Sequence, residues 1–311
     1  MFKSKKRKEW KLEGSYQSQL LTEYLDFLCN HRGLAKNTVR FRRDDIISFL
    51  KSLRLQNDLE DIGKISVKEI HEYVIKTVKL MERPSRRHLV ASIRSFLKFC
   101  LLKGYVNRDL TESVPVIRTP KLGSIPRGIP WESVEKLLAV PDRETHGGRR
   151  IYAVLQLLAT YGVRIGQVTK LRLQDINWHE GSIHFQPSKW GNPLCLPLYP
   201  EVADALLAYI RETRGKAPYP EVFLTVNKPR PLKNGGALSS SLKTCFRNAG
   251  IAASTHAIRH AFATRLMEHD TPIKTIADLL GHKTISTTFI YTKVDLKHLR
   301  LVAYEWPEVL S

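Results

Sequence analysis

The spacing of apolar residues predicts a first half built almost entirely of helices. Apolar residues recur every three or four positions in four segments, residues 15–33, 37–53, 67–80 and 85–104. Glycine or proline stands at the end of most of these segments. None of the chain before residue 110 shows the strict alternation of a strand. We therefore expect residues 1–113 to form an N-terminal helical bundle. The apolar face predicted for its second helix consists of Val39, Phe41, Ile46, Phe49 and Leu50.

Beyond residue 130 the pattern becomes mixed. Helical spacing is found in a segment that opens at Trp131 and in residues 149–162, 200–215, 239–251, 255–270 and 272–280. Thr271 is expected to cap the last of these helices, with Pro272 at its first position. Short strand-like segments cover residues 182–186, 194–198 and 221–225, and the first two flank a turn at 188–192. The predicted fold is therefore mainly α with a small β-sheet, and residues 131–311 form a mixed α/β domain.

A proline-rich segment separates the two halves. Residues 114–130 contain Pro115, Pro120, Pro126 and Pro130. Prolines at this density prevent a continuous helix and favour an extended chain. We expect a linker here, between two domains of ordinary size.

The charge indicates a polyanionic partner. The net charge is +20, and it is spread over the chain: 25 Lys and Arg stand against 14 Asp and Glu up to Pro120, and 25 against 16 after it. Basic charge on both halves suits contact with the phosphates of a DNA duplex. The alternative is a basic protein of the cytoplasm that has no such partner. Four scattered cysteines argue against a zinc site or a disulfide framework, and no apolar run is long enough for a membrane span.

Four residues near the C-terminus carry the candidate chemistry. His256 and Arg259 lie three positions apart, on one helical face. His282 follows the glycine that ends the next helix, and Tyr291 comes nine residues later. A guanidinium, two imidazoles and a phenol suit a phosphodiester better than an acyl group or a sugar.

These residues resemble the C-terminal signature of the tyrosine recombinase (phage integrase) family. The matching segments are His256-Ala257-Ile258-Arg259-His260, Leu280-Gly281-His282 and Ile290-Tyr291-Thr292. The resemblance implies that Arg164 is the family's first catalytic arginine and that Lys189, in the turn of a β-hairpin, is its catalytic lysine. Two positions depart from the family pattern, because Gln167 replaces an acidic residue and the bulky Trp190 follows the lysine.

The resemblance also implies the activity. It implies a site-specific recombinase that cuts and rejoins double-stranded DNA at specific sites through a 3′-phosphotyrosine link, with no metal and no cofactor. Four copies would act on two duplexes in the cytoplasm, in association with the nucleoid. The implied catalytic residues are Arg164, Lys189, His256, Arg259, His282 and Tyr291. The N-terminal bundle resembles the family's SAM-like core-binding domain, and its candidate DNA contacts are Arg40, Arg42, Arg43, Arg86, Arg87 and Arg94.

Two other functions fit the same residues. A type IB topoisomerase shares the chemistry but relaxes DNA as a monomer, without a defined site. A DNA-binding regulator on the same fold would have lost catalysis, which the six catalytic matches argue against. The sequence does not specify the target site, nor whether the task is integration, transposition or resolution of chromosome dimers.

Overall fold

The computed structural model describes residues 15–57, 62–81, 83–117, 128–187, 192–232, 236–282 and 287–288. The chain divides into two compact units, residues 1–121 and 122–311, and each unit has its own hydrophobic core. Lys189, Trp190 and Tyr291 lie outside the described residues. In the described part of the chain, helices dominate and one small sheet is present, which confirms the predicted fold class.

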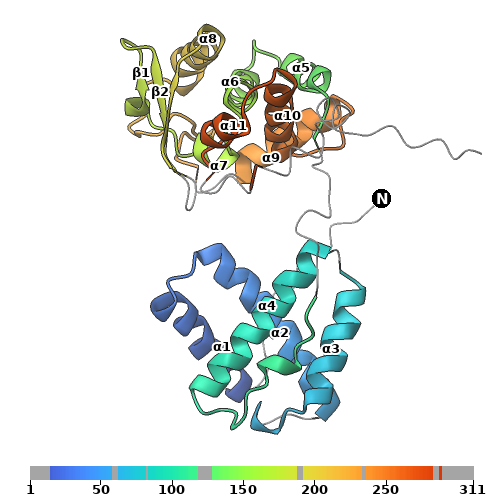
Figure 1. Ribbon diagram of the computed structural model, residues 1–311. Coiled ribbons are helices and arrows are strands. Elements are labelled where there is room, and N and C mark those ends of the chain that lie inside the picture. The colour runs from blue at the N-terminus through green and yellow to red at the C-terminus, as the bar shows by residue number, and fades with distance from the viewer. Residues whose placement is uncertain are drawn as a thin grey trace, which may run out of the picture. The chain divides into compact units, whose positions relative to one another are not determined.

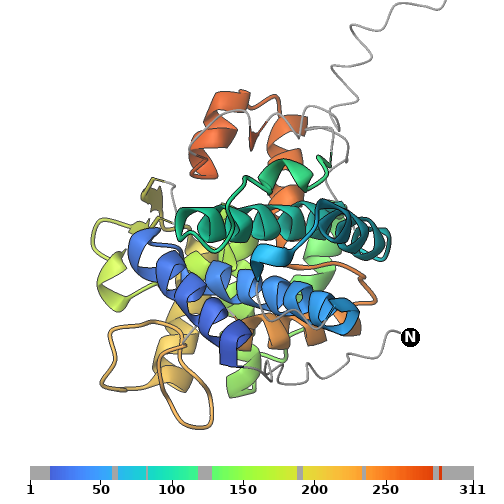
Figure 2. The same ribbon diagram turned by 90° about the horizontal axis from the view of Figure 1, so that it is seen from below.

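The first unit is a helical bundle, as the apolar spacing predicted. Its described α-helices are α1 (Ser15–Asp26), α2 (Lys36–Asn57), α3 (Val67–Lys79) and α4 (Arg83–Leu102). Short helical turns supplement them at η1 (Phe27–His31), η2 (Ile62–Lys64) and η3 (Thr111–Ser113). Helix α4 lies alongside α2 (teal and blue in Figure 2), and Tyr24, Phe49 and Phe96 are fully buried between the helices.

One residue of the predicted apolar face of α2 is exposed. Val39, Ile46, Phe49 and Leu50 are buried as expected, but Phe41 is 51% exposed. At 3.6 residues per turn, position 41 lies about 200° around the helix from Val39, on the far side. The guanidinium of Arg40 covers its ring at 5.4 Å instead.

The second unit packs helices around a long central helix. Its described α-helices are α5 (Trp131–Ala139), α6 (His146–Tyr161), α7 (Ile165–Val168), α8 (Pro200–Tyr209), α9 (Gly236–Asn248), α10 (Thr255–Glu268) and α11 (Ile273–Leu279). Helix α6 contributes the largest set of core residues and contacts α5, α8, α9 and α10. Figure 1 shows α10 and α11 next to each other in this unit. Pro272 caps α11, so Thr271 is not the cap that the sequence predicted; the extended backbone of Pro272 makes Ile273 the first helical residue.

The sheet has three antiparallel strands in the order β1 (Ile176–Asn177), β2 (Ser182–Phe185), β3 (Leu194–Pro197). Strands β2 and β3 are the predicted hairpin, with Phe185 opposite Leu194. The two-residue strand β1 was not predicted, since a pattern needs more than two positions. The turns η4 (Leu173–Asp175) and η5 (Ile210–Arg214) complete the described elements.

The strand predicted at residues 221–225 is wrong. This segment makes only isolated bridges, Arg172 with Glu221 and Leu224 with Pro231. The N–H groups of Val222 and Thr225 donate to backbone carbonyls of Leu171 and Arg230. Two carbonyls accept from side chains instead, that of Glu221 from Arg214 and that of Leu224 from Arg150. Buried guanidiniums therefore take the place of a neighbouring strand at these two carbonyls.

The ends of the predicted linker belong to the two cores. Val114 is buried in the first core, and Ile129 packs against the second. Residues 118–127, between them, lie outside the described part of the chain. In the described residues, no helix is both long and apolar enough to cross a bilayer.

Candidate active site

Arg259 is the most deeply buried of the predicted site residues that the structure describes. It projects from α10 and is 4% exposed. Its Nη1 donates to the carbonyl of Gly162 at 2.7 Å, and its Nη2 donates to the carbonyl of Leu280 at 2.7 Å. Gly162 caps the C-terminus of α6, and Leu280 caps that of α11. The cation therefore satisfies carbonyls at the negative ends of two helices.

His282 hydrogen-bonds to Arg259 on one side and to Thr288 on the other. Its Nε2 lies 2.9 Å from Nη2 of Arg259, and its Nδ1 lies 2.7 Å from Oγ1 of Thr288. A guanidinium only donates hydrogen bonds, so Nε2 must be the acceptor. The network thus assigns the proton of a neutral His282 to Nδ1, which donates to Thr288. In this arrangement Nε2 carries no proton that it can give to a substrate.

Arg164 and His256 belong to the same site, because the charges of Arg164 and Arg259 act on both His256 and His282. Partial desolvation lowers the pKa of His256, and the charges of Arg259 and Arg164 lower it further. Burial, followed by the charges of Arg259, Arg164 and His260, lowers the pKa of His282 to about 4. Both imidazoles are therefore neutral at pH 7. Four of the six predicted catalytic residues come together here, from the start of α7, from α10 and from the turn after α11.

Gln167 occupies a position where the family pattern has an acid, and it uses both ends of its amide. Its Oε1 accepts from the backbone N–H of Arg164 at 3.1 Å, and its Nε2 donates to the carbonyl of Gln186 at 3.2 Å. The side chain is 3% exposed. An ionised carboxylate cannot donate the second bond, so the amide is matched to this site.

The two described ends of the hairpin turn also lie at the site. Gln186, just after β2, contacts Gln167. On the other side, a Cβ built on Gly281 would lie 3.6 Å from the carbonyl oxygen of Asn192, which precedes β3. Lys189 belongs to the segment between them and is outside the described residues, as is Tyr291.

Two contributors to the site were not predicted. Gly162 supplies a carbonyl to Arg259 across 97 positions of sequence, and Thr288 is fully buried against His282. Gly162 ends a segment of helical spacing, so the sequence indicates a helix end there. It does not indicate that the carbonyl of Gly162 binds Arg259. No feature of the sequence distinguishes Thr288 from the neighbouring Thr287.

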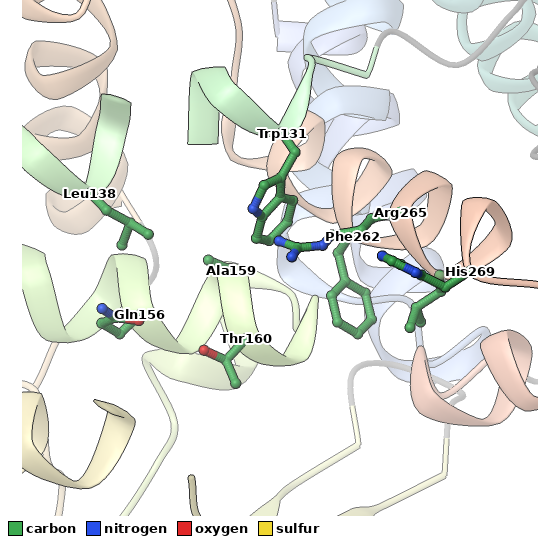
Figure 3. Close-up of a pocket in the computed structure, with 9 residues that line it drawn as sticks. Trp131, Leu138, Gln156, Ala159, Thr160, Phe262, Arg265 and His269 are labelled. Atoms are coloured by element: carbon green, nitrogen blue, oxygen red, sulfur yellow. The ribbon is translucent and has the colours of Figure 1, made fainter. Parts of the chain in front are cut away.

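A second face of α10 carries an aromatic cluster that does not include Arg259. The guanidinium of Arg265 lies 4.1 Å from the ring centroid of Trp131, and Phe262 lines the same pocket (Figure 3). Position 265 lies about 240° around the helix from Arg259. This face holds α5 against α10, and Arg265 offers a matched comparison for Arg259.

The candidate DNA contacts of the first unit fall into two groups. Three half-buried arginines donate to partners within the unit: Arg42 to Oγ of Ser95 at 2.6 Å, Arg86 to the carbonyl of Met81 at 2.8 Å, and Arg94 to the carbonyl of Val114 at 2.7 Å. The other three, Arg40, Arg43 and Arg87, are exposed. Of these, Arg43 pairs with Asp44 at 3.1 Å. Arg42, Arg86 and Arg94 thus have structural contacts that the sequence did not reveal.

Two family models match the chain, one on each unit. The model of the phage integrase family matches residues 129–298, more than half of the chain, and that of the phage integrase N-terminal SAM-like domain matches residues 21–104. The chain belongs to the phage integrase family, the tyrosine recombinases. It is therefore a tyrosine site-specific recombinase, and the resemblance seen in its C-terminal motifs is confirmed.

Relatives of this recombinase match it over nearly its whole length. The tyrosine recombinase XerA of Pyrococcus furiosus is 30% identical over 297 residues, covering 93% of this chain and 94% of that protein. The XerH recombinase bound to a palindromic difH substrate, in a post-cleavage complex, has a similar fold, with a TM-score of 0.71, 14% identity and coverage of 94% and 97%. A lambda integrase tetramer bound to a Holliday junction gives a TM-score of 0.68 at 17% identity, with coverage of 88% and 76%.

Proposed function

We propose that this recombinase cuts and rejoins DNA strands through a covalent link between Tyr291 and a 3′-phosphate. The observation that carries the proposal is the convergence of Arg259, Arg164, His256 and His282 in one site. Two guanidiniums beside two neutral imidazoles provide fixed positive charge together with groups able to accept and donate protons. A phosphodiester in transesterification needs both.

Each residue then has a defined task. Arg164 and Arg259 bind the nonbridging oxygens, where negative charge grows in the transition state. The phenolic oxygen of Tyr291 attacks phosphorus and gives its proton to neutral His256, while the bond to the 5′-oxygen breaks. Lys189 gives a proton to that leaving oxygen. Rejoining is the reverse, with the 5′-hydroxyl as nucleophile and tyrosine as leaving group.

The described neighbours of Lys189 and Tyr291 in the sequence support these tasks. Thr288 contacts His282, and it stands three residues before Tyr291, a reach of roughly 10 Å for extended chain. Gln186 and Asn192, which flank the segment containing Lys189, both lie against site residues. The phosphotyrosine ester conserves the energy of the broken bond, so the proposal requires no nucleotide. The arginines supply the positive charge, so it requires no metal.

We propose a tetramer on two duplexes as the working assembly. The lambda integrase tetramer on a Holliday junction supports the assembly, and the XerH complex with its difH substrate supports contact with DNA, because both share this fold. Both units carry net positive charge, as contact with DNA phosphates requires. We place the working protein on the chromosome, in the cytoplasm.

The covalent link provides the direct test. DNA selected by binding to the full-length protein gives its preferred site, and a duplex of that site with a nick near the cleavage position traps the adduct. We expect an adduct that survives denaturing gels, forms in excess chelator, and carries its nucleotide on Tyr291 after digestion and mass spectrometry. Tyr291→Phe should form none, and Tyr304→Phe should form it normally. An adduct on any other residue contradicts the proposal, and relaxation of supercoils without site preference indicates the topoisomerase function.

The two groups of arginines in the first unit predict different effects of substitution. Arg87→Ala should weaken DNA binding about equally on all sequences and reduce the slope of log affinity against log salt by about 1, without changing stability. Arg94→Ala removes a bond that holds Val114, so it should lower the free energy of unfolding by about 1–3 kcal/mol. Salt titration of binding and urea unfolding followed by circular dichroism measure the two effects. Equal stability losses in both variants would reject the distinction.

A further inference from the structure

The contacts of His282 fix the direction of every hydrogen bond around its ring. Arg259 can only donate to Nε2, and Oγ1 of Thr288 therefore accepts a hydrogen bond from Nδ1–H. Thr288 is fully buried, and its Oγ1 lies 2.7 Å from the ring. A threonine hydroxyl differs from a carboxylate or a carbonyl in this position, because it can also donate.

We propose that Thr288 is a positioning residue whose hydroxyl reverses its hydrogen bond with His282 when a phosphate enters the site. This inference rests on the proposed strand-cleavage function. In the free protein, Thr288 accepts from Nδ1–H while Arg259 donates to Nε2. Once a phosphate oxygen accepts the hydrogen bond that Nη2 of Arg259 had donated to His282, Nε2 loses its donor and must itself carry a proton to contact the same phosphate. Thr288 then donates to Nδ1.

The proton balance is simple. The imidazole releases its Nδ1 proton to water and takes one from water at Nε2, so its net charge stays zero. A doubly protonated ring is the competing way to place a proton on Nε2. The charged and titratable groups acting on His282 oppose it: Arg259 and His260 on α10, and Arg164 before α7. A hydroxyl that can rotate accepts from Nδ1–H in the free protein and donates to Nδ1 in the phosphate complex, so the ring stays neutral in both. A carboxylate or carbonyl could only accept, and an apolar side chain could do neither.

Nitrogen-15 NMR of the histidine rings tests the tautomer directly. We expect His282 in the free protein at pH 7 to be protonated at Nδ1, with its signal assigned by its loss in His282→Gln. With Tyr291→Phe protein bound to its selected duplex, we expect a neutral ring protonated at Nε2. A free ring protonated at Nε2, or a doubly protonated ring in either state, overturns the proposal. The measurement on free protein does not depend on the function being correct.

Substitutions at Thr288 test its part. Thr288→Val keeps the shape and removes the hydroxyl, so we expect single-turnover cleavage to fall about 10- to 100-fold at unchanged DNA affinity. Its DNA complex should no longer show the single Nε2–H form. Thr288→Ser restores the hydroxyl and should cleave within about threefold of the unmodified protein, and Thr287→Val is the neighbouring control. If the unmodified protein forms the Tyr291 adduct and Thr288→Val cleaves equally fast, this inference is wrong; if no adduct forms at all, the proposed function is wrong.

Discussion

Arg259→Lys protein should bind DNA but cleave it about 10³-fold more slowly than the unmodified protein. The guanidinium of Arg259 reaches two helix-end carbonyls and His282 from one planar group. An ammonium is a single point donor on a flexible stem, so it cannot keep these contacts and also fork onto a phosphate. Loss of one such donor in a preorganised site lowers the rate by about 10²–10³-fold. Here the paired N–H donors of the guanidinium and their orientation are lost together. Single-turnover cleavage of nicked duplex measures the effect.

The same substitution should also lower stability. Lysine leaves at least one of the carbonyls of Gly162 and Leu280 without its donor in a buried place, so we expect a loss of about 2–4 kcal/mol. Tryptophan fluorescence during urea unfolding follows the second unit, because four of the five tryptophans lie after residue 121. Arg265→Lys, on the stacked face of α10, is the control and should cleave within about twofold of normal. Cleavage by Arg259→Lys within tenfold of normal would remove Arg259 from the mechanism.

Gly162→Ala is expected to damage folding and chemistry together. Gly162 has φ +59°, which alanine adopts only at a cost of about 1–2 kcal/mol. An added Cβ would lie 2.4 Å from Cδ1 of Phe262, so the ring or the backbone must move. Overpacking of this kind typically adds about 1–3 kcal/mol. Because the carbonyl of Gly162 holds Arg259 and Arg164 follows two residues later, we also expect cleavage to fall by at least about 10²-fold.

A nearby glycine provides the comparison for stability. A Cβ on Gly166 meets no atom within 4 Å, and its φ is not in the positive range. Gly166→Ala should therefore leave the free energy of unfolding unchanged or raise it by up to about 1 kcal/mol. Urea unfolding of both variants side by side measures the difference. Equal stability for the two would show that neither the backbone conformation nor the ring of Phe262 constrains position 162.

The sequence predicted the parts of the fold that depend on local periodicity. Three- and four-residue spacing located the helices of the first bundle, and two short strand-like segments around a turn located β2 and β3. It failed where distant side chains decide the outcome. Residues 221–225 were predicted as a strand, yet Arg214 and Arg150 bind the carbonyls of Glu221 and Leu224. Phe41 was assigned to the buried face although its angular position places it opposite.

The candidate site was predictable only as a set of chemical groups. Motif spacing identified Arg164, His256, Arg259 and His282, and the structure brings these four together. The tautomer of His282 could not be predicted, since it follows from a contact with Arg259 across 23 positions and another with Thr288. The sequence likewise could not show that the amide of Gln167 donates a hydrogen bond, because its partner is the carbonyl of Gln186, 19 positions away. The parts played by Lys189 and Tyr291 stay predictions.

The double attachment of Arg259 to the ends of α6 and α11 has a consequence for reading related sequences. A descendant that abandoned catalysis would still need this guanidinium to keep its helices assembled, so selection for folding alone would preserve it. Its presence in a homologue is therefore poor evidence of an active enzyme. Decay should show first at site positions whose side chains make no contact that the fold needs.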